Sequence, residues 1–231
     1  MSLLTIIQSA SKRVGLNAPT SAIGLTDANV IRMIELSNED GKELADRHDW
    51  QAMTKEATHT TVATESQGLI TAIAGTDFSH ICNGTEWNRS QNRRWFPVQR
   101  EEWQQMKSNN ITGPNTRYRL RGNYLLAFPV PAAGETVAFE WISKNWCTSS
   151  GGTGQQAWAA DADLSLIDED ILVAGLVWRW KASQGLEYAE DFTKYEAMVA
   201  DAIAQDGPQG VLNMGGRSGR GSNIPEGSWP I

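Results

Sequence analysis

The 231-residue sequence is poor in cysteine, in histidine and in long apolar runs, and each shortage excludes a class of protein. Two cysteines, Cys82 and Cys147, cannot form a disulfide framework and favour synthesis in a reducing cytosol. No apolar stretch reaches the roughly 18 residues of a membrane span, so no membrane partner is expected. The N-terminal residues 1–7 carry no charge ahead of their apolar stretch, which does not fit a secretory signal peptide.

Positive charge is also scarce. Lys and Arg number 20 against 27 Asp and Glu, which gives a net charge of −7 and a pI near 5.0. This balance argues against a protein that clamps nucleic acid along a broad basic face. Hydrophobic residues at 40% and charged residues at 20% are typical of a folded chain of this length, with one domain or two unequal ones.

Motifs for catalysis and metal binding are missing as well. His80 and Cys82 could lie on one face of a strand, but two ligands do not make a metal site. Acidic residues gather between 161 and 170, where helix capping explains them without the converging carboxylates that a two-metal nuclease needs. We therefore predict no catalytic residue, no metal site, no cofactor and no enzymatic activity.

The pattern of apolar residues predicts an α+β fold. A helical bundle is expected from residues 1–55 and 160–205, with a small antiparallel β domain inserted at 56–146 and a linker at 147–159. In the second predicted helix, small residues at Ser37 and Gly41 indicate the close approach of another helix. In the β domain, residues 69–73 are predicted as a strand and residues 99–108 as a short helix.

Residues 206–231 are predicted to be a flexible, extended C-terminal tail, because they contain seven glycines and three prolines. Yet the tail also contains apolar and basic residues, namely Leu212, Met214, Arg217, Arg220, Trp229 and Ile231. Two interpretations stay open: an unstructured terminus, or a segment that becomes ordered on a partner.

Tryptophan is abundant, with ten residues against four Tyr and five Phe, and it is the residue most favoured at interface centres. One predicted hairpin combines Trp87 and Trp95 with Arg93 and Arg94. Arg117, Arg119 and Arg121 alternate along a second hairpin and would share one strand face. These groups indicate either a solvated sheet face or a surface for a protein partner, since the acidic balance speaks against nucleic acid.

The segment from Phe139 to Trp146, the Gly/Ser loop after it, the acidic triplet 168–170 and the run 175–181 resemble head–tail adaptor proteins of short-tailed phages and prophages. The family concerned is similar to the tail tubular protein A family. Residues 18–24 and the helix that follows fit the same pattern, so the resemblance covers about residues 1–205.

This resemblance implies a structural protein of the virion, synthesised in the host cytoplasm, that forms a ring, usually twelve-fold, between the portal and the tail nozzle. Genomic DNA would pass through the ring without specific binding. The tail residues named above are then expected to bind the portal. Trp87, Arg93, Arg94 and Trp95 are expected to face the nozzle or a neighbouring subunit. The alternative is a glycan- or cell-wall-binding β module with Trp87, Trp95 and Trp141 as an aromatic platform.

Overall fold

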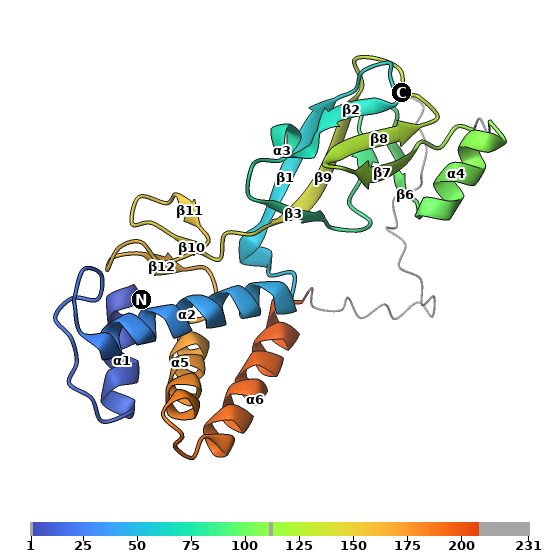
Figure 1. Cartoon of the computed structure of the whole chain (residues 1–231). Coiled ribbons are helices and arrows are strands. Elements are labelled where there is room, and N and C mark those ends of the chain that lie inside the picture. The colour runs from blue at the N-terminus through green and yellow to red at the C-terminus, as the bar shows by residue number, and fades with distance from the viewer. Residues whose placement is uncertain (1, 111–112, 208–231) are drawn as a thin grey trace, which may run out of the picture. The chain divides into compact units, whose positions relative to one another are not determined.

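The computed structural model describes residues 2–110 and 113–207 and has an α+β fold (Figure 1). The described chain divides into two compact units. The helical unit comprises residues 2–53 and 144–207, and the β unit comprises residues 54–143. The chain therefore leaves the helical unit once, builds the whole β unit, and returns.

The helical unit contains four long helices and a short 3-10 turn. They are α1 (Leu3–Arg13), α2 (Ala28–Arg47), η1 (Gln51–Met53), α5 (Glu169–Ser183) and α6 (Ala189–Asp206). Their ends follow local chemistry. Asp27 and Asp168 cap α2 and α5 by accepting hydrogen bonds from Asn29 N and Asp170 N, each at 2.8 Å. Gly185 follows α5 at φ +70°, a conformation that glycine adopts without strain.

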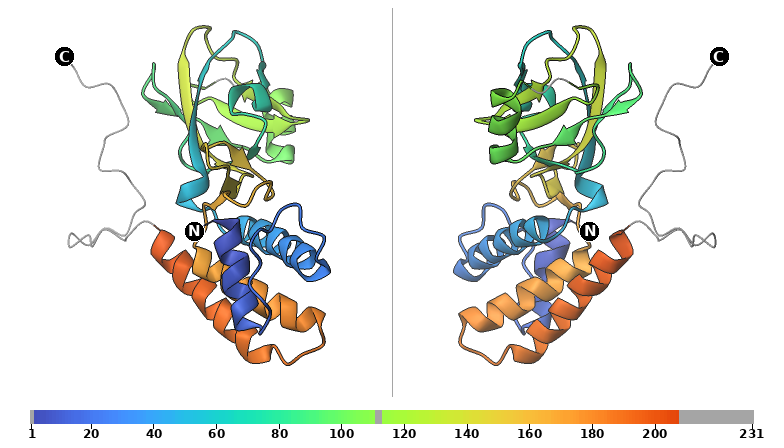
Figure 2. Two further views of the ribbon diagram at one scale, coloured as in Figure 1. Left: turned by 90° about the vertical axis from the view of Figure 1, so that its left-hand side faces the viewer. Right: turned by 90° about the vertical axis from the view of Figure 1, so that its right-hand side faces the viewer.

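Helix α5 is the centre of this unit and contacts α1, α2 and α6 (Figures 1 and 2). Its residues from Ile171 to Val177 are all buried, because neighbours cover the helix on several sides. The partners present apolar faces to it, as the predicted helical spacing requires. On α1 the buried residues include Leu3, Ile7 and Ala10, and on α6 they include Tyr195 and Val199.

The segment predicted as a linker contributes strands and core residues to the helical unit. Short strands β10 (Cys147–Thr148), β11 (Gly154–Gln155) and β12 (Leu164–Ser165) form a sheet in the order β11-β10-β12. Trp146 and Trp158, on either side of the Gly/Ser loop, pack edge to face with ring centroids 4.8 Å apart. The segment between Trp146 and Trp158 has the composition of a flexible loop, but these two tryptophans anchor it at both ends.

Those two tryptophans also correct the expectation for the small residues of α2. A Cβ added to Gly41 would lie 2.5 Å from the Trp146 ring, and the Trp158 indole donates to Ser37 Oγ at 3.0 Å. The small residues thus make room for tryptophan rings, and not for the close approach of another helix. The helix that does approach α2 closely is α5, where Gly175 makes room for Asp40.

The β unit contains two sheets. The first has the order β1-β9-β4-β5, with β3 also paired to β9, and the second has the order β2-β8-β7-β6. The first-sheet strands are β1 (Thr54–Thr60), β3 (Phe78–Ile81), β4 (Trp87–Asn88), β5 (Arg93–Arg94) and β9 (Thr136–Ser143). The second-sheet strands are β2 (Ser66–Leu69), β6 (Phe96–Pro97), β7 (Arg117–Arg121) and β8 (Tyr124–Phe128). Helices α3 (Ile70–Ile73) and α4 (Arg100–Ser108) complete the unit.

Sequence patterns predicted both hairpins and the helix α4, but not α3. Strand β7 turns into β8 through Gly122 and Asn123, both at positive φ, as a tight hairpin turn requires. Helix α4 buries Trp103 and Met106. The predicted strand 69–73 is wrong, because β2 ends at Leu69 and Ile70 begins α3. A short apolar run in a sequence is compatible with a strand and with a helix, so the pattern does not distinguish them.

Candidate functional site

The predicted interface hairpin exists, and β4 pairs with β5 through Trp87 opposite Arg94 and Asn88 opposite Arg93. The Asn88 side chain shapes the turn, since its Oδ1 accepts hydrogen bonds from Ser90 N and Gln91 N at 3.1 Å. Arg93 is exposed and donates to the carbonyl of Pro114 at 3.1 Å. Trp87 is half-buried, so its ring keeps a surface that a partner can contact.

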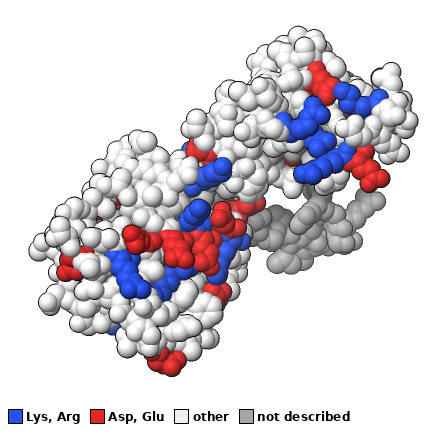
Figure 3. All heavy atoms as spheres, viewed as in Figure 1, with Lys and Arg blue, Asp and Glu red and all other residues white. Residues whose placement is uncertain are grey.

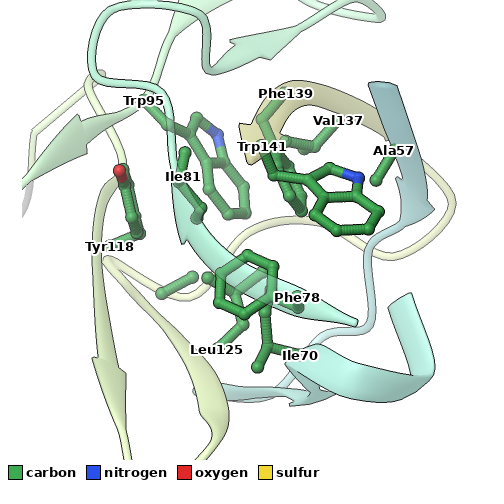
Figure 4. Close-up of a cluster of buried hydrophobic side chains, with 11 residues drawn as sticks. Ala57, Ile70, Phe78, Ile81, Trp95, Tyr118, Leu125, Val137, Phe139 and Trp141 are labelled. Carbon is green, nitrogen blue, oxygen red and sulfur yellow. The ribbon is translucent and has the colours of Figure 1, made fainter. Parts of the chain in front are cut away.

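Trp95 is not part of that surface. Its side chain is 2% exposed and lies in the core of the β unit with Ile81, Tyr118 and Phe139 (Figure 4). Successive residues of an extended chain point to opposite sides, so Trp95 turns inward after Arg94. The expectation that Trp95 contacts the nozzle or a neighbour is therefore corrected, because this residue belongs to the core of the β unit.

Arg94 has a structural task as well. Its guanidinium lies 3.8 Å from Glu86 and covers the ring of Phe96 at 5.3 Å. Glu86 is only 2% exposed and accepts hydrogen bonds from the Tyr118 hydroxyl at 2.5 Å and from Gly84 N at 2.9 Å. Burial and this carboxylate raise the pKa of Tyr118. Arg94 thus balances a buried carboxylate, which leaves Trp87 and Arg93 as the accessible part of the hairpin.

The tryptophans as a group serve the protomer itself. Of the nine in the described residues, seven are buried: Trp50, Trp95, Trp103, Trp141, Trp146, Trp158 and Trp180. The expected aromatic platform of Trp87, Trp95 and Trp141 is not formed, because two of its members lie in the core. This burial removes the observation on which the glycan-binding alternative was based.

An exposed apolar surface occurs elsewhere, at the connection between α5 and α6. We call it the aromatic patch; it consists of the exposed Leu186, Tyr188 and Phe192 together with the half-buried Trp178, against which the two aromatic rings pack. Leu186 is 56% exposed and Phe192 is 38% exposed. Trp178 holds Phe192 and Tyr188 at centroid distances of 5.1 and 6.3 Å. Sequence reasoning missed this surface because it begins in a turn, outside any helical stripe.

A buried polar cluster joins three helices of the helical unit. Asp40 of α2 is fully buried and accepts hydrogen bonds from Arg179 of α5 at 3.0 Å and Tyr195 of α6 at 2.8 Å. Arg179 also donates to Glu43. Burial raises the pKa of Asp40 to about 6, although Arg179 opposes the shift. The cluster is enclosed by helix packing, and we assign it to fold specification.

The remaining candidates do not converge on a chemical site. Asp161 accepts hydrogen bonds from Ser21 Oγ and from Ala22 N and Ile23 N, which lowers its pKa against the effect of burial. Asp163 accepts from the backbone of residues 159 and 160. In residues 2–110 and 113–207, no three His, Cys, Asp or Glu side chains are arranged to hold a metal ion.

Helix α6 ends at Asp206, one residue beyond the predicted limit of the bundle, and Asp206 Oδ2 accepts a hydrogen bond from Gln51 N at 2.9 Å. The candidate portal-binding residues from Leu212 to Ile231 lie outside the described residues. Among the described helices, none is long and apolar enough to cross a bilayer.

These features define a two-unit α+β protein with an exposed apolar surface at the connection between α5 and α6. Among the described residues the candidate side chains form no metal site. The family model of the SU10 adaptor protein matches residues 1–220. The chain therefore belongs to the SU10 adaptor protein family, a family of phage structural adaptors and not of enzymes. A comparison with curated proteins gives no match. Membership makes the protein a structural component of a phage virion.

Proposed function

We propose that this adaptor forms a ring at the head–tail junction, usually of twelve copies, between the portal protein and the tail nozzle. The family match over residues 1–220 carries the proposal, because an adaptor must bind other head and tail components. The two-unit architecture supports it, since a bundle and a separate β unit can serve two different partners. The ring itself is inferred from the resemblance to tail tubular protein A adaptors, and this resemblance is part of the proposal.

Contacts between copies of the chain are assigned to the aromatic patch. Rings of identical copies use heterologous contacts, in which one surface of a copy meets a different surface of the next. Leu186, Tyr188 and Phe192 expose apolar area that water solvates poorly. Burying this area against a neighbour would contribute favourably to association. The seven buried tryptophans cannot make this contribution, because they are already covered within the protomer.

The remaining partners are assigned by elimination within the molecule. Trp87 and Arg93 of the hairpin, with the exposed part of Arg94, are the proposed contact to the nozzle or a neighbouring subunit. The tail residues Leu212, Met214, Arg217, Arg220, Trp229 and Ile231 remain the proposed portal-binding segment. Their mixture of apolar and basic side chains would suit an acidic groove on the portal.

The charge distribution supports a channel through which DNA slides. The helical unit has nine Lys and Arg against eighteen Asp and Glu, a net charge of −9, whereas the β unit has a net charge of +1. Helical units around a channel would repel the DNA backbone and prevent adhesion. Genomic DNA would then pass without specific binding.

The test is assembly with the portal. Purified adaptor alone is expected to sediment largely as a monomer, and mixing with the portal protein should produce a larger particle. Electron microscopy of that particle should show a ring of adaptor copies, and its symmetry gives the number. A stable small dimer that never joins the portal contradicts the proposal.

A further inference from the structure

A groove of about 520 Å³ lies in the β unit between β3 and β7. Its apolar lining includes Ile81 of β3, Leu120 of β7, and Val98, which follows β6. Its charged lining includes Arg100, at the start of α4, with Arg119 and Arg121. The volume is within the range of sites that bind ligands of several hundred daltons. The groove is distinct from the β4–β5 hairpin and from the aromatic patch.

One wall of this groove is an open sheet edge. Strand β7 pairs with β8 over its whole length, but with β6 only at Arg117 and Tyr118. Val98 N donates a hydrogen bond to Tyr118 O at 3.1 Å. Beyond Tyr118, strand β7 continues for three more residues, 119–121. Within the described residues no strand pairs with that side of residues 119–121. Successive residues of a strand bond alternately to its two neighbours, and Arg119 and Arg121 bond to β8. The backbone N–H and C=O of Leu120 are therefore available to an added strand.

The opposite wall has a similar character. Strand β3 pairs with β9, and the described part of the chain places no strand on its other side. His80 and Ile81 of β3 line the groove across from Leu120. An extended peptide that enters the groove would thus lie beside strand edges, with apolar side chains beneath it.

The arginines of the groove have no acidic partner. The side chains of Arg100, Arg119 and Arg121 make no ion pair or hydrogen bond to any described residue, and no carboxylate lines the groove. By contrast, Arg117 on the same strand donates to Glu102 at 2.8 Å. Lys and Arg side chains gather on the β unit around β7 in Figure 3. Three uncompensated guanidinium groups beside one groove favour an anionic ligand.

We propose that this groove binds an extended, acidic peptide segment of a partner protein, which pairs with the open edge of β7. Main-chain hydrogen bonds to the edge would provide affinity, as in other cases of strand addition. Because strand side chains alternate, carboxylates on one face of the peptide would meet the arginines. Apolar side chains on the other face would meet Ile81 and Leu120.

Other occupants fit less well. Residues 207–231 of this chain contain Arg217 and Arg220 but a single acidic residue, Glu226, so they do not provide an acidic segment. A second copy offers few acidic strands, since its described strands carry only Glu56 on β1 and Glu140 on β9, and twelve of the eighteen acidic residues of its helical unit lie on α2, α5 and α6. Duplex DNA needs a broad basic face, whereas here the cations surround a groove with an apolar lining. A partner protein with an acidic extended segment satisfies all of these conditions.

This inference goes beyond the proposed ring and can fail or succeed independently of it, because binding is measured on the adaptor alone. The probe is a fluorescein-labelled eight-residue peptide that alternates Glu and Val, titrated with the full-length protein and followed by anisotropy. The double variant Arg119→Gln/Arg121→Gln should bind at least tenfold more weakly. Lys42→Gln, which removes an exposed cation from α2, should bind as wild type does. Urea unfolding should show that both variants keep wild-type stability.

A second peptide separates strand addition from simple charge attraction. Methylation of alternate peptide nitrogens keeps the carboxylates but removes main-chain donors, and it should weaken binding at least tenfold. Equal binding of the methylated peptide, or no binding of the parent peptide, overturns the proposal. A 12-base-pair DNA duplex bound more tightly through the same arginines also overturns it. The proposal is also overturned if the adaptor self-associates without peptide and the double variant abolishes this self-association, since the occupant would then be a second copy.

Discussion

The ring of Trp146 occupies the space where Gly41 has no side chain, and a Cβ at that position would lie 2.5 Å from the ring. The indole Nε1 of Trp146 donates to the carbonyl of Gln156 at 2.9 Å, which fixes the ring against the helix. Helix α2 is thereby joined to the segment that follows the β unit. This contact replaces the helix–helix approach that the small residues of α2 predicted.

Gly41→Ala is therefore expected to destabilise the protein. In a helix interior alanine is usually favoured over glycine by about 1 kcal/mol. Here the clash with Trp146 should reverse the sign and cost about 1–3 kcal/mol of the free energy of unfolding. Urea unfolding measures the change, and Asp46→Ala, an exposed substitution on the same helix, should stay within about 0.5 kcal/mol of wild type. Additive effects of Gly41→Ala and Trp146→Phe would argue against the contact.

Asp40→Asn should change the dependence of stability on pH. The pKa of Asp40 is raised in the fold to about 6 from the ordinary aspartate value of 3.8, chiefly by burial. The folded state then binds more protons than the unfolded state between these values. Stability from this group is therefore present at low pH and falls as pH rises toward about 6, by roughly 3 kcal/mol. The difference in unfolding free energy between wild type and Asp40→Asn should shift in that sense from pH 3.5 to 7.5. A constant difference would mean that Asp40 titrates normally.

Trp95→Ala and Trp87→Ala should have opposite consequences. Trp95 is 2% exposed, so its truncation should cost about 3–5 kcal/mol of stability and reduce the soluble yield. Trp87 is half-buried in the hairpin, so its truncation should cost less stability and weaken attachment at the proposed nozzle contact by about 2 kcal/mol. Thermal melting and nozzle co-sedimentation measure the two effects. Equal melting temperatures for the variants would contradict the assignment of Trp95 to the core.

The double variant Leu186→Ser/Tyr188→Ser tests the aromatic patch. Both side chains are more than 40% exposed, so the monomer should retain most of its stability. Ring assembly on the portal should weaken strongly, because the loss is repeated at every contact around the ring. Ile31→Ser, at a position 43% exposed on α2, is the matched control and should assemble normally. Normal rings from the double variant would assign the contact between copies to another surface.

Truncation after Gly207 tests the portal-binding segment. The cut is placed there because Asp206 belongs to α6 and interacts with His48 at 3.2 Å as well as with Gln51. The melting temperature should change little, since every described contact is kept. Binding to the portal should fall strongly, as each copy in the ring loses one attachment. If the truncated chain binds the portal as well as the full chain does, the tail has no such role.

Sequence alone determined the elements whose signals are local. Helical periodicity and the caps at Asp27, Asp168 and Gly185 set the long helices, and the Gly122-Asn123 turn set the β7–β8 hairpin. Binary patterns of this kind depend on neighbours within a few residues. The family resemblance depended on motifs spread along the chain, and it agrees with the match over residues 1–220.

Tertiary structure alone decided where the tryptophans lie and which charges remain free. Trp87 and Trp95 come from the two arms of one predicted hairpin, but the alternation of side chains buries Trp95 and leaves Trp87 half-buried. Arg117 and Arg119 alternate on one strand, yet among the described residues Arg117 pairs with a carboxylate, Glu102 of α4, whereas Arg119 pairs with none. Burial and pairing depend on residues distant in sequence, and no local pattern carries that information. For this adaptor the chain therefore fixed the elements, while packing selected the surfaces available to partners.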